Sequence, residues 1–476
     1  MKKALRIPAA RRLRSAFAFI VALASVAPAQ SFNTASRPPE TRAETLVETL
    51  HGVKVSDPYR WLEQGESPEV RAWTEAQNAY TRRTLDPLPG RAAVSQRLSQ
   101  LLAIGTVSAP APRGGRYFYT RREGQQNQPV LYVREGAKAQ DRVLLDPNAL
   151  SPDGTIALDW WYASHDGKRL AYGLSENGNE QSTLYVMDAD TGRNLKEKIP
   201  NTRAASLAWL PGGDGFYYTR FSAPGTVAKG EENYHRRVYL HRLGDDPAKD
   251  VEIFKRERQP TQWPSVGLSR DGRWLTISVS RGTGKNDLYL RDLRDELGEF
   301  ITVAEGKDAS YTARVVGNMM YILSTEDAAM GRIFAVAPAN PRRTSWRVVV
   351  PEAQNSAITS FTVIAEQILV NYLERAASRL AVFTRDGKAV RDVKLPVLGT
   401  ASGTSGEEDG GEAFFTFASY GLPPAVYRYD AATGALGEWA RVDAPTVDAK
   451  AIEVKQVFYQ TKDGTNISMF VVHRKG

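Results

Sequence analysis

The stretch WLPGGDGFYYTR, residues 209–220, places a glycine-rich turn directly before a run of aromatic residues typical of a β-strand. The same unit of turn and strand recurs at intervals of 45 to 57 residues, with a glutamate replacing the glycine in one copy. The seven copies are GRYFYT (115–120), GKRLAYG (167–173), GFYYTR (215–220), GRWLTIS (272–278), GNMMYIL (317–323), EQILVNY (366–372) and GEAFFTF (411–417). A repeat of this period indicates one supersecondary unit used many times.

A second series of short apolar segments follows the first at a similar offset. Its seven copies are LYV at Tyr132, LYV at Tyr185, VYL at Tyr239, LYL at Tyr289, IFAV at Phe334, LAVF at Ala381 and VYRY at Tyr427. A period near 50 residues with several strands suits the blade of a β-propeller, because one small sheet buries both faces only by stacking on its neighbours. We therefore predict a mainly β fold, with a seven-bladed β-propeller over residues 106–448. A pair of non-repetitive β-sandwiches is the alternative, and the two matched series argue against it.

The segments on either side of the repeats do not follow the repeat pattern. Residues 30–105 begin as a polar linker and continue as helices, with Ser67 suited to cap the first one and Pro68 to its first position. Residues 449–476 read as two apolar strands joined by the turn KDGT. We interpret these two strands as the opening hairpin of a domain that the chain does not complete.

The N-terminus has the layout of a signal peptide. Basic residues extend to Arg14, the apolar run AFAFIVALASV occupies residues 16–26, and Ala27-Pro28-Ala29 forms a small-x-small cleavage pattern. We predict a signal peptide at residues 1–29 and an exported protein, periplasmic or extracellular, that leaves the membrane after cleavage. An uncleaved membrane anchor is the alternative. The pair Arg11-Arg12 also raises a twin-arginine export route.

Composition excludes several classes of function. The chain has no cysteine, so disulfides and thiolate chemistry are excluded, and its five histidines form no HxxxH or HExxH pair. We therefore predict no metal and no cofactor. The net charge of +8 is concentrated at the N-terminus, because without residues 1–29 the chain has 56 basic and 54 acidic side chains. This balance does not support a nucleic-acid partner.

Four stretches carry a resemblance to a known family. DPYRWLE at residues 57–63 resembles the signature near the N-terminus of prolyl oligopeptidases, and SHDGKRLAYG (164–173), SRDGRWLTISVSRG (269–282) and QVFYQTKDGTNISMFVVHRKG (456–476) are similar to later parts of that family. The resemblance covers about residues 40–476. It implies a serine endopeptidase that cleaves short peptides after proline. In that family a seven-bladed propeller is inserted into an α/β-hydrolase domain and gates access to a Ser-Asp-His triad.

The chain departs from the family pattern at the nucleophile. The family's serine stands in a GxSxGG elbow between a strand and a helix. The nearest match here is Gly403-Thr404-Ser405-Gly406-Glu407, which has glutamate in place of the second glycine and lies in a stretch, 399–411, that we interpret as a loop between blades. We interpret His165, His235 and His241 as turn or strand-edge residues, and His473 as a partly exposed strand residue. We predict no catalytic residue and no activity for this chain alone.

One substrate-binding residue follows from the resemblance. Arg281, in SRGTGKND (280–287), matches a position from which the family's propeller reaches toward the bound peptide, and a solvated loop arginine is the alternative. In the intact enzyme the partners would be short proline-containing peptides.

Two alternatives for the function remain. One is a secreted propeller that binds peptides or a partner protein without catalysis, and the other is a relative of the family that prefers basic residues. The helices in 67–104 and the terminal hairpin favour an incomplete prolyl oligopeptidase over a binding propeller, because a binding propeller has no use for them. Apolar residues of the hairpin should promote association where no further domain covers them.

Overall fold

The computed structural model describes residues 37–256 and 259–476, so the predicted signal peptide lies outside the described residues. The chain forms two compact units, one ending at Gln96 and the other beginning at Arg97. The division falls inside helix α2 (Arg91–Leu102). Each unit is described by itself.

The first unit contains a small hairpin and a long helix. Strands β1 (Val47–Leu50) and β2 (Val53–Ser56) pair around a His-Gly turn, and a 3-10 turn, η1 (Arg60–Glu63), follows. Helix α1 (Pro68–Leu85) begins as predicted, with the Ser67 hydroxyl accepting a hydrogen bond of 3.2 Å from the amide of Val70. The hairpin was not predicted, because its strands are short and largely exposed and so carry no strong apolar alternation.

The DPYRWLE motif builds a local core in this unit. The indole of Trp61 is buried, donates a 2.8 Å hydrogen bond to the carbonyl oxygen of Arg42, and meets Trp73 of α1 edge to face at 6.4 Å. Arg60 pairs with Asp57 at 2.5 Å. It also pairs with Glu63 at 3.4 Å and with Glu48 of β1 at 2.7 Å, so the motif fixes the turn before α1 by packing and by ion pairs.

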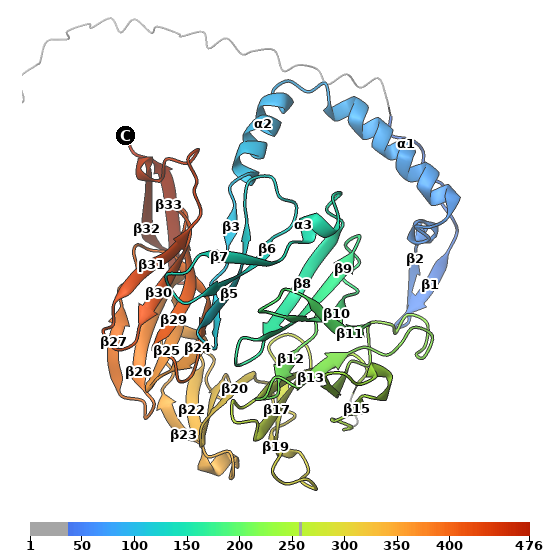
Figure 1. Cartoon of the computed structure of the whole chain (residues 1–476). Coiled ribbons are helices and arrows are strands. Elements are labelled where there is room, and N and C mark those ends of the chain that lie inside the picture. The colour runs from blue at the N-terminus through green and yellow to red at the C-terminus, as the bar shows by residue number, and fades with distance from the viewer. Residues whose placement is uncertain (1–36, 257–258) are drawn as a thin grey trace, which may run out of the picture. The chain divides into compact units, whose positions relative to one another are not determined.

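Within the described residues, the second unit contains seven antiparallel sheets arranged as the blades of a propeller, as the repeats predict (Figure 1). The first three blades comprise β3 (Thr106–Val107), β4 (Ala111–Arg113), β5 (Arg116–Arg122), β6 (Val130–Glu135) and β7 (Asp141–Leu145); β8 (Ile156–Ala163), β9 (Arg169–Glu176), β10 (Thr183–Asp188) and β11 (Asn194–Ile199); and β12 (Leu207–Trp209), β13 (Gly215–Arg220), β14 (Arg237–Arg242) and β15 (Val251–Glu252).

The other four blades are built in the same way. They comprise β16 (Trp263–Leu268), β17 (Trp274–Ser280), β18 (Asn286–Asp292) and β19 (Ile301–Ala304); β20 (Tyr311–Val316), β21 (Met319–Ser324), β22 (Arg332–Val336) and β23 (Arg347–Val350); β24 (Ser356–Ile364), β25 (Gln367–Glu374), β26 (Ala377–Thr384) and β27 (Ala389–Val393); and β28 (Thr400–Gly406), β29 (Glu412–Ser419), β30 (Leu422–Asp430) and β31 (Leu436–Arg441). As far as the structure describes them, the connections contain four short helical turns: α3 (Pro147–Leu150), η2 (Pro247–Lys249), η3 (Arg343–Ser345) and η4 (Ala449–Ala451).

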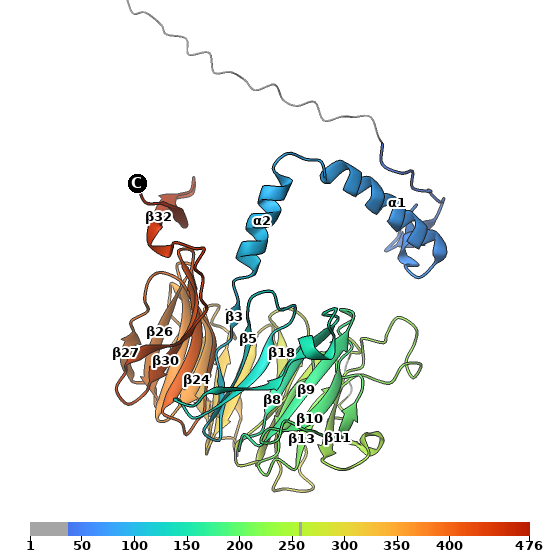
Figure 2. The same ribbon diagram turned by 45° about the horizontal axis from the view of Figure 1, so that its top comes forward.

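The chain runs outward through each blade from its first strand. We call the end of the propeller at which the first strands begin the upper end, and the end at which they stop the lower end (Figure 2). Because neighbouring strands are antiparallel, the turns after the first and third strands of a blade lie at the lower end. The turn after the second strand lies at the upper end.

In the described part of the chain the core consists of seven clusters, each between two neighbouring blades. The second strands contribute most, because both of their faces are covered; in β13 and β21 nearly every residue is buried. This double burial explains why the repeats read as near-continuous apolar runs. One cluster, for example, joins Leu369 of blade six to Phe415 and Phe417 of blade seven.

Side chains close the ring between the first and last blades. No strand is shared there, since β3 to β7 and β28 to β31 form separate sheets. Tyr119 of blade one and Phe414 of blade seven share a buried cluster, and Trp439 packs edge to face on Tyr119 at 5.0 Å. Arg134 lies over the Trp439 ring at 4.5 Å, and the Tyr117 hydroxyl donates a hydrogen bond to Glu412. This seam therefore depends on packing and polar contacts.

The predicted terminal hairpin forms from β32 (Ile452–Gln460) and β33 (Asn466–Arg474). One face meets the upper end of the propeller, where Phe470 contacts Tyr420 at 5.3 Å and Arg375 lies over Phe458 at 5.6 Å. Neither strand contains a buried residue.

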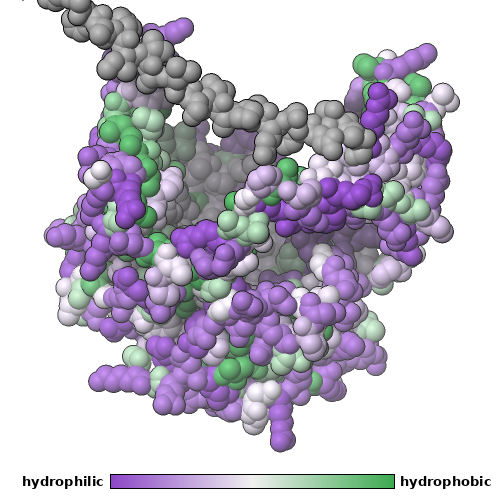
Figure 3. All heavy atoms as spheres, turned by 90° about the horizontal axis from the view of Figure 1, so that it is seen from above, coloured by the Kyte–Doolittle hydropathy of each residue, from purple (hydrophilic) through white to green (hydrophobic). Residues whose placement is uncertain are grey.

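The opposite face of the hairpin is apolar in its half next to the turn. Val457 pairs with Met469 and Tyr459 with Ile467, so these four side chains share that face. Hydrophobic side chains are exposed on this side of the propeller when it is seen from above (Figure 3).

One element differs from its prediction. Residues 399–411 were interpreted as a loop, whereas residues 400–406 form β28, the first strand of blade seven. The strand is irregular between Ser402 and Ser405 and none of its residues except Ala401 is buried. A first strand with a single buried residue needs no apolar alternation, so the glycines and serines of β28 gave no strand signal in the sequence.

Candidate functional site

Ser-x-Asp-Gly turns place side chains at the lower end of the propeller. In the turn after β16, the Ser269 hydroxyl donates a 2.5 Å hydrogen bond to Asp271, and Gly272 adopts a φ of +73° that disfavours other residues. The turn at residues 164–167 has the same sequence pattern and the same serine-to-aspartate bond. The variable second residue of each turn, Arg270 in the first case, lines a cavity.

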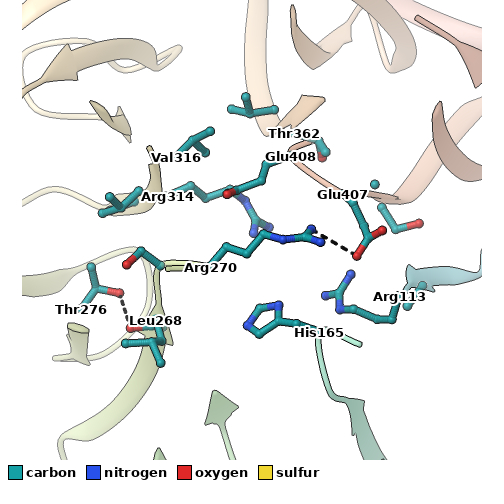
Figure 4. Close-up of a pocket in the computed structure, with 18 of the residues that line it drawn as sticks. Arg113, His165, Leu268, Arg270, Thr276, Arg314, Val316, Thr362, Glu407 and Glu408 are labelled. Carbon is teal, nitrogen blue, oxygen red and sulfur yellow. Dashed lines mark hydrogen bonds and ion pairs between the residues drawn. The ribbon is translucent and has the colours of Figure 1, made fainter. Parts of the chain in front are cut away.

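This cavity has a volume of about 320 Å³ and lies where the first strands end. Its walls come from six of the seven blades, and Figure 4 shows charged side chains facing one another across it. Its charged and titratable lining residues are Arg113, His165, Arg270, Arg314, Glu407 and Glu408. We call this the lower-mouth cavity. Leu268 and Val316 supply apolar wall.

Ion pairs neutralise only part of this cluster. Arg270 contacts Glu407 at 3.3 Å and Asp409 at 2.7 Å. Arg113 donates a 2.6 Å hydrogen bond to the carbonyl oxygen of Pro112. Among the described residues, neither Arg113 nor Arg314 forms an ion pair with a carboxylate.

The surrounding protein shifts the pKa values of both the arginines and the glutamates that line the cavity. Burial lowers the pKa of the Arg113 and Arg314 guanidinium groups, against the opposing attraction of Glu407 and Glu408 respectively. Burial also raises the pKa of Glu407 and Glu408, although Arg270 opposes both shifts. For these four side chains the cost of burying the charge is therefore larger than the stabilisation from charges of opposite sign. This balance is characteristic of a site that an additional charge can stabilise.

The closest match to a nucleophile elbow lies in the wall of the same cavity. The Ser405 hydroxyl donates a 2.5 Å hydrogen bond to the carbonyl oxygen of Pro110, which ties blade seven to blade one. The segment continues into the strand β29 and not into a helix. His165 also lines the cavity, and burial lowers its pKa. The hydroxyl of Ser405 is thus engaged in a hydrogen bond across the seam between blades seven and one.

Two other histidines occupy different surroundings. His241 lies on β14, an interior strand of blade three, so its interpretation as a turn or strand-edge residue is wrong. It is fully buried, and its Nδ1 lies 2.8 Å from a carboxylate oxygen of Asp250, which also accepts a 2.7 Å hydrogen bond from Tyr218. His235 pairs with a glutamate four residues earlier in the loop after β13.

Arg281 lies at the upper end, in the turn between β17 and β18. Its Nε is 2.9 Å from Asp287, it also donates to the carbonyl oxygen of Lys307, and 22% of its side chain is exposed. The structure therefore places Arg281 far from the lower-mouth cavity along the blade. Its role toward a peptide stays a prediction.

The described residues hold neither a metal-binding cluster nor a membrane-spanning helix. They contain no cluster of three or more His, Asp or Glu side chains arranged to hold a metal ion. No helix among them is long and apolar enough to cross a membrane.

The family is decided by comparison with known proteins. Residues 38–441 match the family model described as prolyl oligopeptidase, N-terminal beta-propeller domain. The chain belongs to the prolyl oligopeptidase family. The chain is 30% identical over 441 residues to a prolyl endopeptidase of Elizabethkingia meningoseptica and 29% identical over 441 residues to one of Elizabethkingia miricola.

Solved structures of prolyl oligopeptidases have the same fold. A structure from a study of two prolyl endopeptidases superposes with a TM-score of 0.86 at 39% identity, covering 92% of this chain and 64% of that one. A Galerina marginata prolyl oligopeptidase B bound to a 35mer substrate superposes with a TM-score of 0.82 at 22% identity. The chain spans about 62% of the length of the two curated relatives, although they cover 92% of this chain.

Proposed function

We propose that this chain is the propeller-bearing N-terminal portion of an exported prolyl endopeptidase and has no peptidase activity alone. The named relatives are prolyl endopeptidases, and the chain matches only the first part of the family's pattern. It contains no GxSxG elbow. In the whole protein, the propeller would restrict access to short proline-containing peptides.

The uncovered face of the terminal hairpin carries this proposal. Tyr459 is 51% and Met469 47% exposed, although both lie on one apolar face of an antiparallel pair. Apolar side chains gathered on one face of a sheet are ordinarily buried against another layer. Both strands of this sheet also have a free edge. We infer that further strands and helices of a hydrolase domain cover this face in the whole protein.

The test is made on the protein in its source cells. An antibody raised against the propeller should detect a polypeptide well above 52.6 kDa, the mass of this chain. A fluorophosphonate probe should label a serine in that same polypeptide, whereas the purified 476-residue chain should stay unlabelled and leave a chromogenic Gly-Pro substrate intact. A cellular product at or below 52.6 kDa would contradict the proposal and favour a propeller that binds peptides without catalysis.

The export part of the proposal has its own measurement. The mature protein, recovered from the periplasm or medium, should begin at Gln30, directly after Ala29. Recovery of the intact N-terminus, Met1 included, from the cytosol would contradict it.

A further inference from the structure

At the lower end of the propeller, Arg270 links two blades that are not neighbours in the ring. Blades four and seven share no buried cluster in the part of the chain that the structure describes. Arg270, in the turn after β16 of blade four, nevertheless contacts Glu407 at 3.3 Å and Asp409 at 2.7 Å, both in the turn after β28 of blade seven. Its guanidinium therefore reaches across the lower-mouth cavity from one side of the ring to the other (Figure 4).

The charges around this contact are balanced in number but divided between blades. The three carboxylates follow one another in the single turn of blade seven: Glu407, Glu408 and Asp409. The three arginines come from blades one, four and five: Arg113, Arg270 and Arg314. All of the negative charge in the network therefore lies on the blade beside the seam, and its attraction is to other blades.

We propose that Arg270 is a latch that holds blade seven in the ring, and that its release opens the seam between blades one and seven. Blade seven is the last in the chain, so no connecting segment joins it directly to blade one. Side chains alone hold the seam, among them Ser405, which bonds the carbonyl oxygen of Pro110 and stands two residues before Glu407. Movement of the turn that contains Glu407 would therefore pull on this bond.

Glu407 is the partner on which the latch depends. The Asp409 side chain is 61% exposed, and an ion pair so close to water contributes little, whereas the Glu407 side chain is only 15% exposed. Burial raises the pKa of Glu407, and the charge of Arg270 is the first of the effects that oppose this increase. Among the described residues, Arg270 is the one arginine in ion-pair contact with this turn.

Loss of Arg270 would leave the carboxylate of Glu407 largely buried without a cation in contact. Removal of one partner from a buried ion pair costs more than the intact pair contributes, because the remaining charge stays desolvated. Movement of the turn into water relieves that cost. The same movement separates blade seven from blade one, since Ser405 lies on the strand that leads into the turn.

Hydrogen exchange of the purified chain tests the latch with two matched variants. Arg270→Gln removes the latch, whereas Arg273→Gln removes an arginine of the same turn whose ion pair with Asp292, at 2.7 Å, stays within blade four. We expect Arg270→Gln to accelerate exchange about tenfold or more in β5 and β29, on the two sides of the seam, and to leave β13 of blade three unchanged. Arg273→Gln should leave β5 and β29 as slow as in the parent chain.

A second substitution separates the latch from a general loss of stability. In the Arg270→Gln variant the uncompensated charge is that of Glu407, so the further change Glu407→Gln should return exchange in β29 to within about threefold of the parent chain. A turn that is merely weakened would not recover when another of its contacts is removed.

Four results would overturn the proposal. They are no acceleration in Arg270→Gln, acceleration confined to blade four, acceleration spread equally over all seven blades, and no recovery on adding Glu407→Gln. The exchange is measured without substrate, so none of these results depends on the proposed peptidase function.

Discussion

The propeller and the terminal hairpin are both built from antiparallel strands, yet they differ in how much of their apolar surface is covered. In blade seven, Phe415 and Phe417 are fully buried against blade six. In the hairpin, Phe458 and Tyr459 remain about half exposed. The comparison shows that the blades complete one another's cores, whereas the hairpin lacks a second layer.

Substitution of one phenylalanine in each region gives the sharpest contrast. Phe417→Ala should lower the free energy of unfolding by about 3–5 kcal/mol, because it opens a cavity in a closed core. Phe458→Ala should cost less than about 1 kcal/mol, since half of its ring is exposed. Urea unfolding followed by circular dichroism measures both. Equal losses would mean that the hairpin belongs to the cooperative core.

The uncovered hairpin face should cause self-association. Replacing Tyr459 and Met469 together by lysine places two charges on that face and should weaken association by about tenfold or more. Sedimentation velocity of both proteins over a range of concentrations measures the effect. The control, Gln460→Lys, adds a charge at an exposed polar position and should associate as the parent chain does. A parent chain that stays monomeric at all concentrations would remove the basis of this expectation.

A smaller effect is expected at the seam between blades one and seven. Asp141 accepts hydrogen bonds from Arg134 at 2.7 Å and Arg121 at 2.9 Å, and Arg134 lies against Trp439. Burial alone would raise the pKa of Asp141, but the hydrogen bond from Arg134, together with the positive charges of Arg134 and Arg121, outweighs it and lowers the pKa.

The sign of the pH dependence follows from that lowered pKa. The carboxylate stabilises the fold above its ordinary pKa of about 4, and this contribution is lost as the pH falls through the folded-state value. Asp141→Asn should therefore cost about 1 kcal/mol at pH 7 and almost nothing near pH 2. Thermal unfolding of both proteins at the two pH values measures the difference. A loss that is the same at both would assign the effect to shape and not to charge.

The parts of the fold that could be predicted from sequence are those with both faces buried. Second strands such as β13 and β21 must be apolar throughout, so they stand out as repeats at a fixed period. The exposed strand β28 and the hairpin β1–β2 carry no such constraint, and the sequence did not distinguish them from loops.

The lower-mouth cavity could not be predicted for a different reason. Its charged and titratable residues come one or two at a time from five blades, so no linear motif contains them. The one local signal is the second residue of the Ser-x-Asp-Gly turns, which is His165 in one turn and Arg270 in another. Arg314 and Glu408 lie in segments with no distinguishing pattern. Three-dimensional proximity alone brings these charges together.

Hydrogen exchange of the purified monomer, resolved along the sequence by mass spectrometry, tests the central contrast most directly. We expect slow exchange through residues 106–441, where the seven blades bury one another, and fast exchange in residues 452–474 of the hairpin. Protection of the hairpin as slow as that of the second strands of the blades would contradict the account, because it would show a hairpin that is stable without a covering layer.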